Sequence, residues 1–307
     1  MYYGVDMGGS KIAIATFDEQ GQEQERSVFA TPQSAYSELI ALLVEWITQA
    51  DHRWQTQGSV GVGFPGIKDA QGRLLAPNVP AIHGQYLQQD LQRQLNRRVY
   101  ADNDAHCFLM SEYQGGAAQS RDLALALTLG TGLGGALIHK GQLVNSHRGG
   151  SAEFGHGVIN AGLLARYPEL PLFACGCGLR GCLETYVSGT GLARLYQYLN
   201  PPSTKNASLS GPAIIAAWRQ GEADAQKTLS LYLDILASGL GNLMTQLDPD
   251  VIVLGGGLSD HAWLYQELNA RLPAYLMRDV EPAPVMAPVF GGSGGVRGAA
   301  LLAKCAI

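Results

Sequence analysis

Residues Tyr2 to Gln22 read YYGVDMGGSKIAIATFDEQGQ, and this stretch decides the fold class. An apolar strand enters a glycine-rich turn, a second apolar strand leaves it, and a polar turn containing glycine follows. The same order recurs from Leu125 to Gln142, which reads LALTLGTGLGGALIHKGQ. Because one hairpin design is used twice, the sequence predicts two related domains that face each other rather than one larger fold.

Strand and helix patterns alternate over the rest of the chain. Apolar spacing predicts helices over residues 35–50, 86–95, 228–247 and 298–306, and short buried strands over residues 59–64, 99–101 and 250–254. Glycine or a turn residue follows several of the predicted strands. This alternation predicts an α/β protein that binds its ligands at the carboxyl ends of the strands.

Composition excludes several classes of protein. The chain has 307 residues, enough for two domains, and its 46% hydrophobic content is sufficient to bury a large core. The net charge of -5 argues against a nucleic-acid partner. No apolar run approaches the roughly 20 residues of a membrane helix, and no secretory signal is recognisable. We therefore expect a cytoplasmic protein with no membrane partner.

Three glycine-rich loops follow predicted strands, at Gly4–Lys11 (GVDMGGSK), Gly130–Gly135 (GTGLGG) and Gly255–Ser259 (GGGLS). Glycine lets backbone N–H groups approach phosphate oxygens closely. One such loop could be only a tight hairpin turn, but three together favour a nucleotide held between two domains. We expect ATP and Mg²⁺ to be bound by Asp6, Gly8, Gly9, Ser10, Lys11, Gly130, Thr131, Gly132, Gly134, Gly135, Gly255, Gly256 and Gly257. A strand pattern follows GTGLGG, which argues against a dinucleotide-binding unit.

Carboxylates supply the candidate catalytic groups. Asp102, Asn103 and Asp104 stand at the end of a predicted strand. A kinase that acts on an alcohol needs a carboxylate to accept the hydroxyl proton, although the same tripeptide is also a common turn or helix cap. Glu153 and Glu184 are further candidates because they lie on either side of a cysteine cluster.

That cluster is CGCGLRGC, which contains Cys175, Cys177 and Cys182. Three thiols within eight residues, flanked by glycine, predict a zinc site, and a tetrahedral structural site requires a fourth ligand. His156 is the best candidate for that ligand, and His139 and His147 are weaker ones. A closed Cys₃His site leaves no open position for a water molecule, so we expect a structural role. The other two cysteines, Cys107 and Cys305, are interpreted as small buried apolar residues.

In this order, the motifs resemble the ROK family of sugar kinases and transcriptional repressors. The resemblance covers nearly the whole chain and rests on DMGGSK, GFPG (63–66), DNDA (102–105), LGTGLGG, EFGH, CGCGLRGCLE and LGGGLS. It implies an actin-like, hexokinase-like (ribonuclease H-like) fold of two α/β domains with a central cleft. The expected domains are residues 1–118 with 296–307, and residues 119–295. A homodimer is the common state of the family. The repressors carry an additional N-terminal helix-turn-helix domain, which we do not expect here because the first phosphate hairpin begins at Tyr2.

The resemblance also assigns roles by position. It implies that Asp104 is the catalytic base, and that His156, Cys175, Cys177 and Cys182 bind structural zinc. It places the sugar on Gly66, Asn78, Asn103, Asp104, Glu153, His156 and Glu184. Two positions depart from the family pattern: Ser10 replaces a threonine, and His106 stands where asparagine is common.

The implied partners are ATP with Mg²⁺ and an amino sugar or hexose. Within the family, the MYYG start, Asn78-Val79-Pro80, DND and the long gap between His156 and Cys175 resemble the members that act on N-acetyl-D-glucosamine. This closer resemblance implies phosphorylation of that sugar at its 6-hydroxyl. A glucokinase or fructokinase with the same parts remains an alternative. A sugar-sensing binding protein without catalysis, or an actin-like ATPase that forms filaments, are alternatives from other classes.

Overall fold

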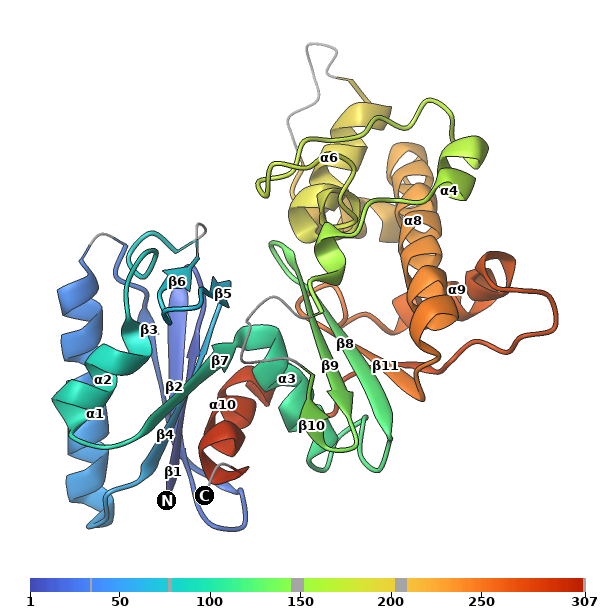
Figure 1. The fold of residues 1–307 in the computed structure, drawn as a ribbon. Helices are drawn as coiled ribbons and strands as arrows, with labels where there is room; N and C mark the ends of the chain where they lie inside the picture. Colours follow the sequence, from blue (N-terminus) through green and yellow to red (C-terminus); the bar gives the residue numbers. More distant parts are fainter. Residues whose placement is uncertain (34, 77–78, 145–151, 202–208, 306–307) are drawn as a thin grey trace. The chain divides into compact units, whose positions relative to one another are not determined.

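The computed structural model describes residues 1–33, 35–76, 79–144, 152–201 and 209–305 (Figure 1). By its internal contacts the chain divides into two compact units. The first unit comprises Met1–Asp122, Ala136–Ser151 and Pro288–Ile307, and the second comprises Leu123–Gly135 and Ala152–Ala287. The domain borders expected from the sequence stay a prediction.

The first unit contains a five-stranded sheet in the order β3-β2-β1-β4-β7. Its strands are β1 (Tyr2–Met7), β2 (Lys11–Phe17), β3 (Glu23–Ala30), β4 (Ser59–Phe64) and β7 (Val99–Asn103). Strands β1, β4 and β7 are parallel, and β2 is antiparallel to both β1 and β3. The carboxyl ends of the three parallel strands therefore meet at one edge of the sheet. A small hairpin, β5 (Ile67–Lys68) and β6 (Leu74–Leu75), follows β4.

Helices cover both faces of this sheet (Figure 1). On one face lie α1 (Tyr36–Trp54) and α2 (Leu87–Leu95), and on the other lie α3 (Asp104–Tyr113) and α10 (Gly294–Cys305), which follows the short helix η4 (Gly291–Ser293). The backbone of α10 packs directly on the strands. A Cβ atom at Gly4 or Gly61 would lie only 1.9 or 1.7 Å from a carbonyl oxygen of α10, so these strand positions require glycine.

The second sheet has the order β10-β9-β8-β11-β12. It is formed by β8 (Leu123–Leu129), β9 (Leu133–His139), β10 (Gln142–Leu143), β11 (Val251–Gly255) and β12 (Val285–Met286). The strands β8, β11 and β12 are parallel, and β9 pairs antiparallel with β10. Position by position, this order repeats that of the first sheet. The internal repeat predicted from the two hairpins is therefore confirmed.

The helices of the second unit are α4 (Ala161–Arg166), α5 (Glu184–Val187), α6 (Gly189–Leu199), α7 (Gly211–Arg219), α8 (Ala223–Leu247) and α9 (Ala262–Arg271), with the short helices η2 (Phe154–His156) and η3 (Leu272–Tyr275). The predicted helices and strands all form. Two of them begin earlier than expected, because α8 begins at Ala223 and α10 at Gly294.

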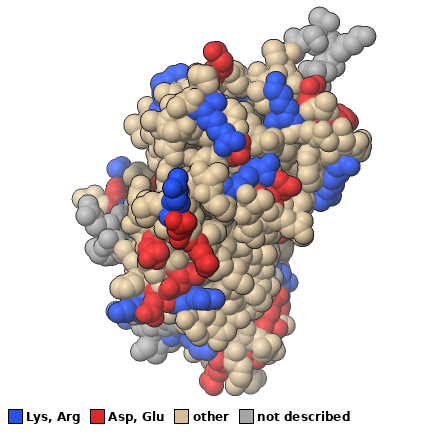
Figure 2. All heavy atoms as spheres, turned by 90° about the vertical axis from the view of Figure 1, so that its right-hand side faces the viewer, with Lys and Arg blue, Asp and Glu red and all other residues tan. Residues whose placement is uncertain are grey.

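Two further observations concern the surface and the helices. On the face drawn in Figure 2, acidic and basic side chains of the described residues are interspersed, with no broad basic patch. That face therefore offers no extended basic surface for the phosphate backbone of a nucleic acid.

In the described part of the chain, every helix is too short or too polar to cross a lipid bilayer.

Candidate active site and metal centre

The first glycine loop joins β1 to β2, and Asp6 lies at its start. Gly8 donates its backbone N–H to the Lys11 carbonyl oxygen at 2.9 Å, which closes the turn. Burial raises the pKa of the Asp6 carboxyl, while Lys11 and Arg26 oppose this effect with their positive charges. A partly buried carboxylate beside a glycine turn can hold Mg²⁺ through water, as expected for a magnesium nucleotide.

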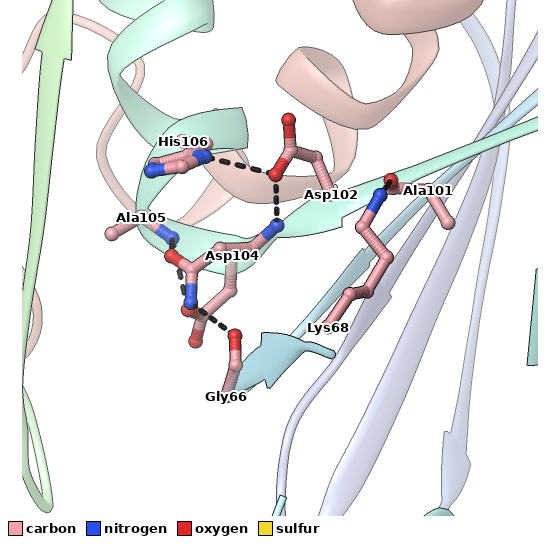
Figure 3. Close-up of polar contacts among 8 residues, drawn as sticks. Gly66, Lys68, Ala101, Asp102, Asp104, Ala105 and His106 are labelled. Atoms are coloured by element: carbon pink, nitrogen blue, oxygen red, sulfur yellow. Dashed lines mark hydrogen bonds and ion pairs between the residues drawn. The ribbon is translucent and has the colours of Figure 1, made fainter. Parts of the chain in front are cut away.

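Asp104 lies where β7 passes directly into α3 (Figure 3). The preceding residue, Asn103, caps the helix, because its Oδ1 accepts the Ala105 N–H at 2.8 Å. The Asn103 Nδ2 atom donates to the Gly66 carbonyl oxygen at 2.9 Å, which ties the end of β7 to the turn after β4. Gly66 has φ +102°, and a Cβ there would lie 2.3 Å from the Leu75 oxygen. Only glycine fits this turn.

The Asp104 carboxyl lies in an electrostatically unfavourable place. Burial, and then the nearby Asp6 carboxylate, raise its pKa to about 7, although the Ala105 N–H and His106 act in the opposite direction. A carboxyl group whose pKa lies near neutral pH can both accept and release a proton at working pH. The geometry therefore suits Asp104 to general-base catalysis.

In the second unit, the parallel strands β8 and β11 bring two glycine loops side by side. The loop Gly130–Gly135 follows β8, and Gly255–Gly257 ends β11 and continues beyond it. Gly256 has φ +81°, and a Cβ there would lie 2.5 Å from the Leu129 oxygen. The Leu258 N–H donates to that same oxygen at 3.2 Å. The two loops thus form one glycine-lined edge.

Glu184 connects this edge to the cysteine cluster. Its Oε2 accepts the Leu133 N–H at 2.9 Å and lies 2.6 Å from where a Cβ on Gly132 would be. Its Oε1 lies 3.8 Å from Cys175 Sγ, within reach of the thiol proton. A single carboxylate at the start of α5 therefore contacts both the glycine loop and a candidate metal ligand.

The four predicted zinc ligands converge. The ligand atoms of His156, Cys175, Cys177 and Cys182 all lie within 4.8 Å of one another. Cys175 Sγ is 3.6 Å from His156 Nδ1, and Cys177 Sγ is 3.6 Å from Cys182 Sγ. Sulfurs bound tetrahedrally to zinc, each at about 2.3 Å, are about 3.8 Å apart. The two 3.6 Å separations are therefore close to those of a tetrahedral zinc site.

Backbone hydrogen bonds shape this cluster. Cys175 donates its N–H to the Leu179 oxygen at 2.9 Å, and Gly178, with φ +93°, occupies the turn between them. Burial and the neighbouring thiols raise the pKa of Cys182 to about 12. A divalent cation would offset this effect, because it stabilises thiolates directly. The long stretch between His156 and Cys175 contains α4, which explains the wide spacing of these two ligands.

Known proteins resemble this chain over almost its full length. The sequence model described as "ROK family" matches residues 2–306. The chain belongs to the ROK family. The N-acetyl-D-glucosamine kinase of Salmonella paratyphi B is 40% identical over 304 residues, which are 98% of this chain and 99% of that protein.

Solved structures of ROK proteins share the fold. The ROK hexokinase from Thermus thermophilus superposes with a TM-score of 0.85 at 29% identity, covering 99% of this chain and 98% of that one. A ROK family glucokinase from Streptomyces griseus, in complex with glucose and AMPPNP, gives a TM-score of 0.81 at 30% identity and covers 99% of both chains. The expected actin-like, hexokinase-like α/β fold is therefore confirmed.

Most of the predicted residues of this ROK protein fall into two groups. Asp6, Gly8, Gly9, Ser10, Lys11, Gly66, Asn103 and Asp104 lie in the first unit, after its parallel strands. The second unit holds the other two glycine loops, Glu153, Glu184 and the cluster of His156 with three cysteines. His156 Nε2 lies 3.7 Å from Glu153 Oε2, so the ring nitrogen that does not face the sulfurs faces Glu153. Asn78 and His147 lie outside the described residues.

Sequence reasoning missed two features of the site. At Gly295, in the first turn of α10, a Cβ would lie 2.4 Å from Asp6 Oδ2. The glycine-rich stretch GGSGG over residues 291–295 was its signal, because glycine at a helix start can mark close approach of another group. The second feature is the buried contact between Asp102 and His106, whose i,i+4 spacing was its one signal, although Asp102 itself lies on β7 and not on the helix.

Proposed function

We propose that this protein transfers the γ-phosphoryl group of ATP to the 6-hydroxyl of N-acetyl-D-glucosamine, giving N-acetyl-D-glucosamine 6-phosphate and ADP. The observation that carries the proposal is Asp104, a carboxyl at a strand–helix junction whose pKa is raised to about 7. The substrate is argued from the 40% identity to a relative named as the kinase for that sugar.

Asp104 accepts the proton of the sugar hydroxyl as the oxygen attacks the phosphorus atom. The glycine loops bind the nucleotide: Gly8–Lys11 and Gly130–Gly135 donate backbone N–H groups to phosphate oxygens, and Gly255–Gly257 lie against the adenosine. Asp6 holds the hydrated Mg²⁺ that accompanies ATP. That ion supplies positive charge against the phosphate oxygens.

The sugar hydroxyls are held by Gly66, Asn78, Asn103, Glu153, His156 and Glu184, together with Asp104. Support for His156 comes from its orientation, since Nδ1 faces Cys175 and Nε2 faces Glu153. Zinc on Nδ1 would fix the ring and leave Nε2 for a sugar hydroxyl. We therefore assign zinc a structural role through His156, Cys175, Cys177 and Cys182.

A second candidate function is a glucokinase. The Streptomyces griseus relative is named a glucokinase and is 30% identical to this chain. The residues that catalyse phosphoryl transfer would be the same in a glucokinase and in an N-acetylglucosamine kinase. Only the part of the pocket that surrounds the 2-substituent of the sugar would differ.

The test is ADP release by the purified protein with Mg²⁺–ATP, measured over N-acetylglucosamine, glucose, mannose, N-acetylmannosamine and fructose. We expect the highest kcat/KM for N-acetylglucosamine. A preference for glucose or fructose would keep the mechanism and replace the substrate. No turnover with any sugar, in protein that contains zinc, would favour a binding protein. Sugar-independent ATP hydrolysis would favour a filament-forming ATPase.

A further inference from the structure

The Asp102 carboxylate joins the end of β7 to the first turn of α3 (Figure 3). Its Oδ1 accepts the backbone N–H of Asn103 at 2.8 Å and lies 2.8 Å from His106 Nδ1. Only 8% of Asp102 and 2% of His106 are exposed. A polar pair is therefore buried directly beside the proposed catalytic base.

Every residue from Asp102 to His106 takes part in this junction. The Ala105 N–H is shared between Asn103 Oδ1 at 2.8 Å and Asp104 Oδ1 at 2.9 Å. Directly before Asp102, the Ala101 carbonyl oxygen accepts a hydrogen bond from Lys68 Nζ at 2.7 Å. Because Asp104 lies between the two ends of the Asp102–His106 contact, its backbone cannot turn without breaking that contact.

Stability alone is a weak reason for such a pair. Removing two polar groups from water costs about as much free energy as their attraction returns, and apolar residues of similar size often stabilise a core more. An ordinary N-cap is already present in Asn103. The pair thus adds a second constraint to a helix start that is already capped.

We propose that Asp102 and His106 form a positioning pair for Asp104, which holds the carboxylate of the base in its working orientation and places a histidine beside it. The proposal rests on the function proposed above, because it presumes that Asp104 is the base. The electrostatic interaction with His106 lowers the pKa of Asp104, whereas burial and Asp6 raise it. The pair therefore affects the pKa of the Asp104 carboxyl as well as its orientation.

The neighbouring charged and titratable groups, in the described part of the chain, limit what else could act on Asp104. Asp6 on β1 and His106 on α3 act on the Asp104 pKa through their charges, and the charges of Asp102 and Asp104 act on the Cys107 thiol of α3. Two cations of the same unit, Lys68 on β5 and Arg297 on α10, make their hydrogen bonds to other residues. Lys68 is bonded to the Ala101 oxygen, and Arg297 to Ser111 and Gln114. Of the side chains whose charges act on the Asp104 pKa, His106 is the one that lowers it, whereas Asp6 raises it.

The first test needs no substrate. The carboxyl carbon of Asp104 is followed by ¹³C NMR from pH 4 to pH 9, with Asp104→Asn used for assignment. We expect His106→Asn to move the Asp104 midpoint upward by about 0.5 to 1 pH unit, because the interaction with His106 that lowers the Asp104 pKa has been removed. Leu109→Ala is the matched control, since it removes a fully buried side chain from the same helix. It should lower the melting temperature and leave the midpoint in place.

The second test is kinetic. His106→Ala should lower kcat by about 10- to 100-fold, with KM for sugar and for ATP within about threefold of wild type. His106→Gln, which keeps an amide donor toward Asp102, should restore part of kcat. Asp102→Asn combined with His106→Ala should cost no more than His106→Ala alone, because the two residues act as a unit.

An unchanged Asp104 midpoint in His106→Asn, with a melting temperature lowered as in Leu109→Ala, would overturn the proposal and leave a purely structural pair. If wild-type protein turns over none of the sugars, the proposed function fails. The NMR titration still decides whether His106 controls Asp104 in that case.

Discussion

Asp104 combines a fixed backbone with an unfavourable electrostatic position. It is the first residue of α3, and its carboxyl group lies near a second carboxyl, that of Asp6. Two carboxylates that share a site disfavour each other's ionisation, and burial disfavours it further. The same arrangement that raises the pKa of Asp104 to about 7 therefore lowers the stability of the folded protein when the carboxyl group is charged.

Asp104→Asn removes the proton acceptor and preserves the size and polarity of the side chain. We expect kcat to fall by about 10² to 10⁴, with binding of the sugar retained. Calorimetric titration with the sugar and an ADP-release assay measure the two quantities separately. Turnover equal to that of the wild type would remove Asp104 from the role of base.

Asp104→Asn should also change how stability depends on pH. The pKa of Asp104 is raised in the folded state, so the unfolded chain loses this proton first as pH rises above about 4. The folded wild-type protein therefore loses stability from about pH 4 to about pH 7, and the Asp104→Asn variant, which has no proton to lose there, avoids that loss. Urea unfolding should show the variant to be more stable than wild type at pH 8, by about 1 to 3 kcal/mol. The difference should shrink toward zero at pH 4, and an equal difference at both values would contradict the assignment.

The cysteine cluster is an element without a core of its own. Its backbone closes through a few turns, such as Cys175 to Leu179 and Gly181 to Phe173, and Cys177 is exposed at its tip. Short loops of this kind have little apolar surface to bury, and metal coordination supplies the missing stabilisation. His156 joins this loop from η2, so order in the cluster extends to the sugar-binding side chain proposed beside it.

Cys177→Ser should weaken zinc binding and leave the orientation of the His156 ring less well fixed. We expect the KM for the sugar to rise about 10- to 100-fold, while KM for ATP stays within about threefold, because the nucleotide loops do not contain the ligands. Metal analysis should find one zinc per wild-type chain and much less in the variant. His139→Ala is the control, since it alters the described histidine that competes for the role of fourth ligand and lies exposed at the end of β9. It should keep zinc, and loss of zinc there would contradict the ligand set.

The whole chain repeats one architectural plan. Both sheets place a hairpin beside parallel strands, and in both units glycine loops follow the carboxyl ends of those strands. Gly8–Lys11 and Gly66 lie at these ends in the first unit. Gly130–Gly135 and Gly255–Gly257 hold the same places in the second. The repeat thus accounts for several phosphate-binding candidates on one chain.

Ligands that bind only the folded chain should stabilise the whole molecule. At a concentration of 100 times its Kd, N-acetylglucosamine should add about 2.7 kcal/mol, and Mg²⁺–ADP should do the same on its own. Thermal unfolding should therefore shift upward by several degrees with either ligand. Stabilisation by nucleotide alone, with none by any sugar of the panel, would contradict a sugar kinase and favour the filament-forming ATPase.

The α/β class, the repeated hairpin, the glycine loops and the set of His156 with three cysteines could all be predicted from the amino-acid sequence. These features are local: glycines that the turns require, a thiol cluster within eight residues, and apolar periodicity that reports burial along one element. Each can be read in a window of about 20 residues. His156 could be predicted as the fourth member of the cluster because few histidines lie near it in the sequence.

The surroundings of Asp104 could be seen only in the folded chain: Asp6 and His106 act on its carboxyl group, and Gly295 packs against Asp6. The contact of Gly295 with Asp6 joins residues almost 300 positions apart, and α10 reaches it by packing on glycines of β1 and β4. The pKa of Asp104 likewise depends on burial and on a carboxylate from another strand. Burial and long-range charge are properties of the packed chain, so no local pattern could have supplied them.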